Sequence, residues 1–271
     1  MRVFFALGGT TRIAADDALL PLPGAAGAWA ENTIRGPAIT LALSRALERE
    51  SAGRPELRAV RATFDLHSAV PKRPLQSRSR VLRDGRRLLL AESELLIDGS
   101  VYARARGLFL RPTPEPEHQV MARIVDIELP PLPDHGLVSE AEGAILYWSE
   151  GASWTAARGA HRNDHRKAVW FSATSLVEGE ELSGFGRASV VADMGNLVVN
   201  WAARGISEIN ADASLSLARE PAAAEIGAVT LARFAHAGIV VGAAVLFDRE
   251  GPFGLSAVSS LPPAGPASVR V

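Results

Sequence analysis

Two stretches of the chain carry apolar residues at the spacing of a helix. The first reads IRGPAITLALSRALERE, and Pro37 suits its opening turn because a first-turn N–H has no acceptor inside the helix. Its apolar positions fall on one face: Ile39, Leu43, Ala46 and Leu47. The second reads SGFGRASVVADMGNLVVNW, and its apolar series is Val190, Val191, Met194, Leu197, Val198 and Trp201. Both stretches are therefore predicted to be long amphipathic helices.

Strand-length segments follow each predicted helix. In the first half, Asp84-Gly85 and Asp98-Gly99 are strong hairpin-turn dipeptides. In the second half, INADASLSLARE, GAVTLARFAH, GIVVGAAVLFD and GPFGLSAVSSL are separated at Pro221, 236–238 and 248–251. Strand alternation in GAVTLARF predicts one face with Ala228, Thr230, Ala232 and Phe234, opposite Val229, Leu231 and Arg233. Each half therefore reads as a helix followed by an antiparallel meander.

A proline-rich stretch at 111–136 divides the chain, and its closely spaced prolines exclude helix and keep the backbone extended. We expect an N-terminal domain at 1–115, a linker at 116–136 and a C-terminal domain at 137–271. A long helix needs cover for its apolar face, and a curved antiparallel sheet is the element available. Joining the two sheets would remove an exposed edge from each. The prediction is an α+β fold with two similar halves, each a sheet wrapped around a long helix, and one continuous sheet.

Composition narrows the functional classes. The 271 residues are 47% hydrophobic and 22% charged, which is typical of a globular protein. The net charge is -1 and the arginines are scattered, which argues against nucleic acid or an anionic membrane as the main partner. The absence of cysteine excludes disulfides, thiolate nucleophiles and cysteine-based metal sites. The apolar runs are too short for a signal peptide or a membrane span, so a soluble, cytoplasmic protein is expected.

Several weak motifs, in their order and spacing, resemble one known family. In the first half these are RGPAITLALSRALE, FDLHSAVPKRPL and VLRDGRRLLLAESELLIDGSVYARARG; in the second they are ADMGN, INADASLSLAREP and AAVLFDREGPFGLSAVSSL. Together they resemble the double-hotdog acyl-CoA thioesterases of the thioesterase II type, over about residues 25–110 and 140–262. The resemblance implies two tandem hotdog folds and hydrolysis of the thioester between an acyl chain and coenzyme A.

The same resemblance implies functional positions, of which this chain keeps one in three. The family's acid lies on the second hotdog helix in an Ala-Asp-x-x-Asn stretch, which Asp193 matches in ADMGN. A threonine on the following strand corresponds here to Ala211, and a glutamine near the end of the last strand corresponds to Ser259. Asp193 is thus the expected general base, and we expect Asn210 and Ser259 to replace the missing groups in part.

Helix geometry adds substrate-binding candidates. Asn196 and Asn200 share the flank of Asp193 at the i+3 and i+7 positions, so they form a polar stripe where a substrate groove is expected. Gly36 and GFGRAS, residues 184–189, lie at helix starts whose free N–H groups are candidates for holding the thioester carbonyl. Ala211 is expected to line the groove. Arginines available for coenzyme A phosphates are Arg35, Arg78, Arg80, Arg86 and Arg87, although strand arginines commonly lie on a solvated face.

The predicted function is hydrolysis of acyl-CoA, the small-molecule partner, by water that Asp193 activates. The alternative is a catalytically silent acyl-CoA or acyl-chain binding protein, which the loss of threonine and glutamine favours. A dehydratase-type hotdog would need a histidine on a central helix, and neither predicted helix has one. No cofactor is expected beyond the coenzyme A of the substrate, and no metal, because His161, Asp164 and His165 lack an evident further ligand. The resemblance also allows pairing as a homodimer.

Overall fold

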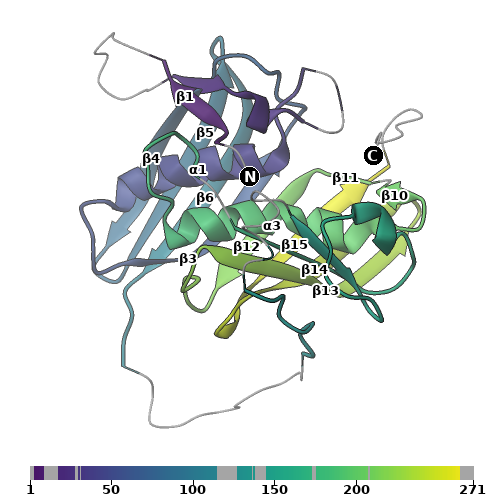
Figure 1. Cartoon of the computed structure of the whole chain (residues 1–271). Coiled ribbons are helices and arrows are strands. Elements are labelled where there is room, and N and C mark those ends of the chain that lie inside the picture. The colour runs from purple at the N-terminus through teal and green to yellow at the C-terminus, as the bar shows by residue number, and fades with distance from the viewer. Residues whose placement is uncertain are drawn as a thin grey trace.

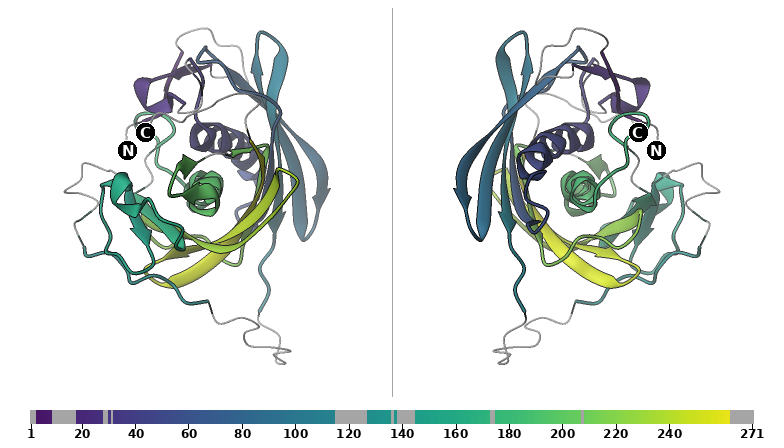
Figure 2. Two further views of the ribbon diagram at one scale, coloured as in Figure 1. Left: turned by 90° about the vertical axis from the view of Figure 1, so that its right-hand side faces the viewer. Right: turned by 90° about the vertical axis from the view of Figure 1, so that its left-hand side faces the viewer.

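The computed structural model describes residues 3–8, 18–27, 30, 32–114, 127–135, 137, 145–172, 175–206 and 208–262. Two long helices, α1 (Gly36–Ser51) and α3 (Gly184–Asn200), lie side by side against one curved antiparallel sheet (Figure 1). Viewed along their axes, both helices lie within the curve of that sheet (Figure 2). The predicted α+β class and double-hotdog arrangement are confirmed.

The N-terminal half wraps α1 with four long strands. They are β3 (Arg58–Leu66), β4 (Gln76–Gly85), β5 (Leu88–Ile97) and β6 (Ser100–Leu110). A separate small sheet joins β1 (Phe5–Leu7) to β2 (Leu19–Pro21), and η1 (Pro23–Ala25) follows it. The predicted apolar face of α1 is buried, with Leu43 and Leu47 fully inside the core.

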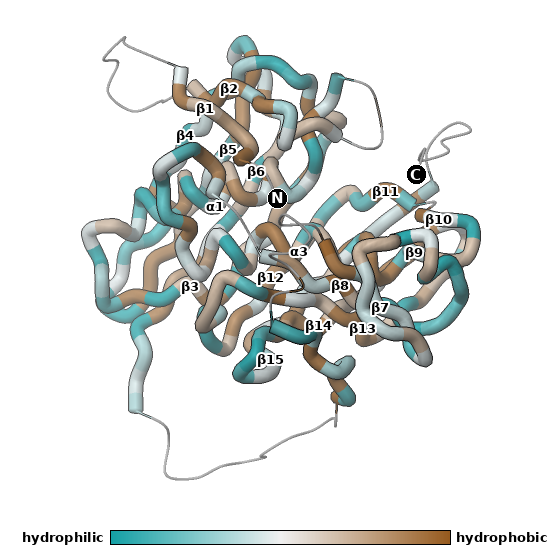
Figure 3. The backbone as a smooth tube through the Cα atoms, in the orientation of Figure 1, coloured by the Kyte–Doolittle hydropathy of each residue, from teal (hydrophilic) through white to brown (hydrophobic). Residues whose placement is uncertain are grey.

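The C-terminal half repeats this arrangement around α3. Its main strands are β12 (Asp212–Leu217), β13 (Glu225–His236), β14 (Ile239–Asp248) and β15 (Gly251–Leu261). The shorter elements are β7 (Leu146–Ser149), η2 (Arg158–His161), β8 (Lys167–Ser172), β9 (Trp201–Ala202), β10 (Gly205–Ile206) and β11 (Ile209–Asn210). Hydrophobic residues gather along α3 and the strands beneath it (Figure 3), and α3 is buried on almost every side.

The two halves share one sheet because β12 pairs antiparallel with β3, from Asp212 opposite Asp65 to Ser216 opposite Arg61. The helices pack antiparallel across this junction: the Thr40 hydroxyl donates to the Ser189 carbonyl oxygen at 3.0 Å. The start of α1 consequently lies against the middle of α3, where Asp193 is found. This arrangement places residues of both halves at one site.

Local details correct two sequence expectations. Asp98 and Gly99 form the predicted turn with positive φ angles of 49° and 79°, but Gly85 pairs with Leu88, so Arg86 and Arg87 form the other turn. In β13 a register shift between Thr230 and Ala232 ends the predicted alternation. Thr230 and Arg233 both bond to α3, whereas Phe234 is 71% exposed. The reason is the extra residue of a β-bulge, which reverses the side-chain phase beyond it.

Residues 127–135, inside the predicted linker, run along the C-terminal half. Ile127 and Leu129 pack on a second apolar cluster that includes Trp170 and Phe247. Arg249 donates to the Pro133 carbonyl oxygen at 3.2 Å and ties this segment to the sheet. In the part of the chain that the structure describes, no helix is long and apolar enough to cross a membrane.

Candidate active site

Asp193 is a buried carboxylate in the middle of α3, with 8% of its surface exposed. It faces Gly36, the first residue of α1, so closely that a Cβ on Gly36 would collide with both carboxylate oxygens. Glycine is therefore the residue type that fits here. The charge lies at the start of α1, where Pro37 has no N–H and the N–H groups of Ala38 and Ile39 donate to the Arg35 carbonyl oxygen. The N–H of Gly36 is therefore the one that helix geometry leaves without an acceptor inside the helix.

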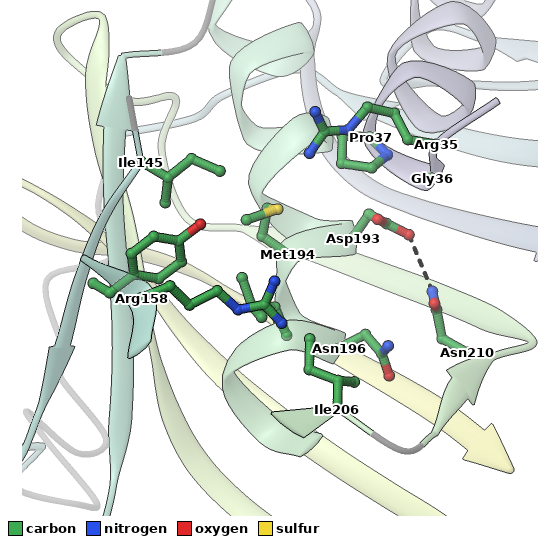
Figure 4. Close-up of a pocket in the computed structure, with 12 residues that line it drawn as sticks. Arg35, Gly36, Pro37, Ile145, Arg158, Asp193, Met194, Asn196, Ile206 and Asn210 are labelled. Carbon is green, nitrogen blue, oxygen red and sulfur yellow. Dashed lines mark hydrogen bonds between the residues drawn. The ribbon is translucent and has the colours of Figure 1, made fainter. Parts of the chain in front are cut away.

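Asn210 is the hydrogen-bond partner of this carboxylate. Its side-chain Nδ2 donates to Asp193 Oδ1 at 3.0 Å and to the Asp212 carbonyl oxygen at 3.2 Å (Figure 4). Burial raises the pKa of Asp193 above its ordinary value, while the Asn210 hydrogen bond and the Arg35 charge oppose that rise. The result is a carboxylate more basic than one in water, which suits a general base.

Two cavities meet at Asp193, and Gly36 and Asn210 line both of them. The smaller, about 130 Å³, lies beneath η2 and β7; its other lining residues are Arg35, Pro37, Ile145, Tyr147, Arg158, Met194, Asn196, Leu197 and Ile206. The larger, about 410 Å³, is mainly apolar and includes Ile34, Ile39, Leu66, Val70, Ile209, Ala211 and Leu261. Asp193 therefore stands where a bound molecule can extend in two directions.

The two asparagines of the predicted polar stripe separate in space. Asn196 lines the smaller cavity, but its amide donates to the Glu208 carbonyl oxygen and accepts from Asn200 and Ser260. Asn200 lines a different cavity beside Thr230 and accepts from Arg233, so its predicted place in the Asp193 groove is wrong. The reason is that Asn200 lies almost two turns along the helix.

The structure does not bring Ser259 to Asp193. In the second half of β15 the buried residues are Ser256, Val258 and Ser260, and Ser260 donates to Asn196 on α3. Alternation turns Ser259 to the outer face of the sheet, where its main chain bonds to Asp212 and Ala211. The expectation that its hydroxyl orients water beside Asp193 is therefore corrected. Ala211 does line the larger cavity, as expected.

The helix start at GFGRAS also lies elsewhere. Ser183 caps it by accepting from Gly186 N at 2.9 Å, and this end of α3 packs beside the C-terminal part of α1. Its N–H groups are remote from Asp193, so Gly36 is the helix start that the structure brings to the site. Within the described ranges, no group of three His, Asp or Glu residues is arranged to hold a metal ion.

Two cavity residues had no signal in the sequence. Tyr147 lies in β7, far ahead of α3 in the sequence, and Arg158 begins η2, which is too short to show a periodic pattern. Both reach the site because β7 and η2 fold back over α3. Of the arginines proposed for phosphates, Arg35 lines the smaller cavity, whereas Arg78 and Arg80 pair with Glu94 and Glu92 on the sheet surface.

Comparisons with known proteins agree with this fold. Residues 26–114 match the model of the acyl-CoA thioesterase N-terminal domain. No curated protein sequence matches the chain.

Solved structures match over nearly the whole chain. A putative thioesterase of Novosphingobium aromaticivorans is 21% identical, with a TM-score of 0.67 over 97% of this chain and 100% of that one. The tesB protein of Mycobacterium avium subsp. paratuberculosis is 13% identical, with a TM-score of 0.63 over 92% of each chain. A hot dog protein of unknown function from Alicyclobacillus acidocaldarius is 11% identical, with a TM-score of 0.66 over 94% and 96%. The resemblance drawn from the sequence is thus confirmed: residues 26–114 match the acyl-CoA thioesterase N-terminal domain, and 92% of the chain shares the fold of the solved tesB protein.

Proposed function

We propose that the chain hydrolyses acyl-CoA thioesters, with Asp193 as the general base. The observation that carries this proposal is the buried carboxylate at the meeting point of two cavities. A thioester has two arms, the acyl group and the pantetheine of coenzyme A, which diverge at the reacting carbonyl. The arrangement supplies one cavity for each arm and a base where they join.

In this mechanism, Asp193 takes a proton from water as the water oxygen attacks the thioester carbonyl carbon. The negative charge that develops on the carbonyl oxygen is stabilised by the N–H of Gly36 at the start of α1. Collapse of the tetrahedral intermediate breaks the carbon–sulfur bond, and the leaving thiolate receives the proton from Asp193. The Asn210 amide holds the carboxylate in place throughout.

The test is release of free coenzyme A from short to long acyl-CoAs by the wild type and by Asp193→Asn. General-base catalysis contributes about 10²- to 10⁴-fold, so turnover should fall by that factor. Asp65→Asn, at an exposed position of strand β3, is the matched control and should keep full activity. The asparagine variant removes a buried charge, so its melting temperature at neutral pH should equal or exceed that of the wild type. Unchanged turnover in a folded Asp193→Asn protein would refute the role of Asp193.

The second candidate function is binding of acyl-CoA without hydrolysis. Two observations favour it: Ala211 carries no hydroxyl, and Ser259 lies on the outer face of the sheet. A silent protein would bind acyl-CoA and would release no coenzyme A from any of the acyl-CoAs tested. Any turnover that depends on Asp193 would exclude it.

A further inference from the structure

Arg158 reaches the smaller cavity from η2, on the side opposite Asp193 and Asn210 (Figure 4). Its guanidinium carbon lies 5.6 Å from the centre of the Trp201 ring. Trp201 in turn meets Tyr147 edge to face, with 5.3 Å between the ring centres. These ring contacts hold the cation at the wall of the cavity.

One edge of this guanidinium has no partner. Nε and Nη2 of Arg158 are buried and make no hydrogen bond within the described part of the chain. These two atoms form the edge on which arginine holds a carboxylate. Elsewhere in this protein the same edge is occupied: Nε and Nη2 of Arg80 bond to Glu92, and those of Arg249 bond to Glu225. Buried donors without an acceptor are uncommon in proteins and point to a ligand.

The surroundings of Arg158 favour an anion. Arg35 lines the same cavity, so two arginines stand against the single carboxylate of Asp193 among its lining residues. Tyr147 lies within electrostatic range of both cations: burial raises the pKa of its hydroxyl, while Arg158 and Arg35 act to lower it. The phenol is therefore protonated at neutral pH and can donate a hydrogen bond to an anionic oxygen.

Size decides which part of a substrate this anion belongs to. The cavity of about 130 Å³ has room for only a few water-sized groups. The phosphates of coenzyme A are separated from the thioester sulfur by the whole pantetheine arm, which is too long for this space. Between Asp193 and Arg158 the walls are mainly apolar, with Ile145, Met194, Leu197 and Ile206 beside the polar Asn196. Such walls fit a few methylene groups that end in a charged group.

We propose that Arg158 binds a carboxylate at the far end of a short acyl group, so that the preferred substrates are coenzyme A thioesters of short dicarboxylic acids. This proposal rests on the proposed function, since the thioester carbonyl is placed at Asp193. The larger, apolar cavity then accommodates the pantetheine arm. Arg158 is a specificity-determining residue and takes no part in the transfer of protons.

Kinetics with substrates of matched length provide the first test. Glutaryl-CoA and valeryl-CoA have acyl chains of equal length and differ in the terminal carboxylate. The wild type should show the higher kcat/KM with glutaryl-CoA. Arg158→Gln should lower that value by about 10- to 100-fold, as for loss of a charge-assisted hydrogen bond, and leave valeryl-CoA hydrolysis almost unchanged. The kcat/KM of Arg158→Lys for glutaryl-CoA should lie between those of the wild type and Arg158→Gln. Arg162→Gln removes a neighbouring exposed charge and should have the kcat/KM of the wild type.

Binding provides a second test that does not depend on hydrolysis. Calorimetry with thioether analogues, S-(4-carboxybutyl)-CoA and S-pentyl-CoA, should show a preference for the carboxylate that Arg158→Gln abolishes. This preference would stand even if no thioester were hydrolysed, which would overturn only the proposed function. Equal affinity of the wild type for both analogues would overturn the proposal. Weaker binding of free coenzyme A by Arg158→Gln would also overturn it, because Arg158 would then contact coenzyme A itself.

Discussion

The two ends of the helix pair are related by the repeat of the fold, yet they differ in chemistry. Arg45 lies as far from the start of α1 as Asp193 lies from the start of α3. At one end, Gly36 faces the Asp193 carboxylate and two cavities open beside it. At the other end, Gly184 faces Glu220, and Arg45 is paired with Glu180.

This difference shows how a duplicated fold can retain a single site. At the Arg45 end the helix start is capped by the Ser183 side chain, and an ion pair occupies the position equivalent to the acid. The cap and the ion pair stabilise the fold there, because they satisfy the helix-start N–H groups and the charged side chain. At the other end the corresponding groups remain available to a substrate. At the Asp193 end, the buried carboxylate destabilises the folded state, and a destabilising buried charge in a cavity is typical of a functional site.

The largest expected effect comes from adding one methyl group at each end. Gly36→Ala would place a Cβ against the Asp193 carboxylate, so the carboxylate or α1 must shift, and kcat/KM for acyl-CoA should fall by about 100-fold or more. Gly184→Ala meets Glu220, whose Cβ would lie only 2.8 Å away, so the chain must shift locally there too. That shift is remote from Asp193, so the variant should retain activity within about two-fold. Steady-state assays of both folded variants test this contrast. Equal losses in the two would contradict it.

Removal of the Asn210 amide should have a smaller effect. Asn210→Ala leaves Asp193 in place without its hydrogen bond, and an activity loss of about 10-fold is expected from poorer orientation. Because that hydrogen bond lowers the Asp193 pKa, its loss should also move the acid limb of the pH–rate profile to higher pH. A profile unchanged from the wild type would show that Asn210 does not act on the base.

The pH dependence of kcat/KM in the wild type tests the role of Asp193 without any substitution. A general base must be ionised, and burial raises the pKa of Asp193 above its ordinary value of 3.8. The kcat/KM should therefore fall as the pH drops toward that raised pKa, with its midpoint above 3.8. The same burial favours the protonated form, so the contribution of Asp193 to folding stability should be fully present below pH 3.8 and be lost as the pH rises through its raised pKa. An acid limb at or below 3.8 would contradict this assignment.

The smallest expected effect on activity lies at the Arg45 end. Glu48 is half-buried near Ser183 and Glu220, and its partial removal from solvent raises its pKa from 4.5 to about 7. A carboxyl whose pKa rises on folding favours the folded state below pH 4.5, and this contribution is lost as the pH rises through 7. Glu48→Gln should match the wild type at pH 4 and be more stable at pH 8 by roughly 1 to 3 kcal/mol. Thermal unfolding at both pH values measures this, and turnover should be unaffected.

The sequence predicted the parts of this molecule that depend on local patterns. Helical spacing located α1 and α3, and turn residues located most strands; the pairing of Asp193 with Asn210 was also expected. Ser259 was placed wrongly because a single residue of register decides which face of β15 it occupies. The bulge in β13 and the arrival of Arg158 from η2 depend on tertiary packing, for which spacing along the chain carries no information.

The packing of α1 against α3 has a consequence for how this protein can be divided. Gly36 comes from one repeat and Asp193 from the other, so neither half contains a complete set of site residues. Separate expression of 1–114 and 127–271 would give two inactive fragments, which regain the site only by pairing β3 with β12 and packing α1 against α3. Because both repeats belong to one chain, they are always produced in equal amounts. The two repeats can therefore differ in sequence, with one supplying Gly36 and the other supplying Asp193.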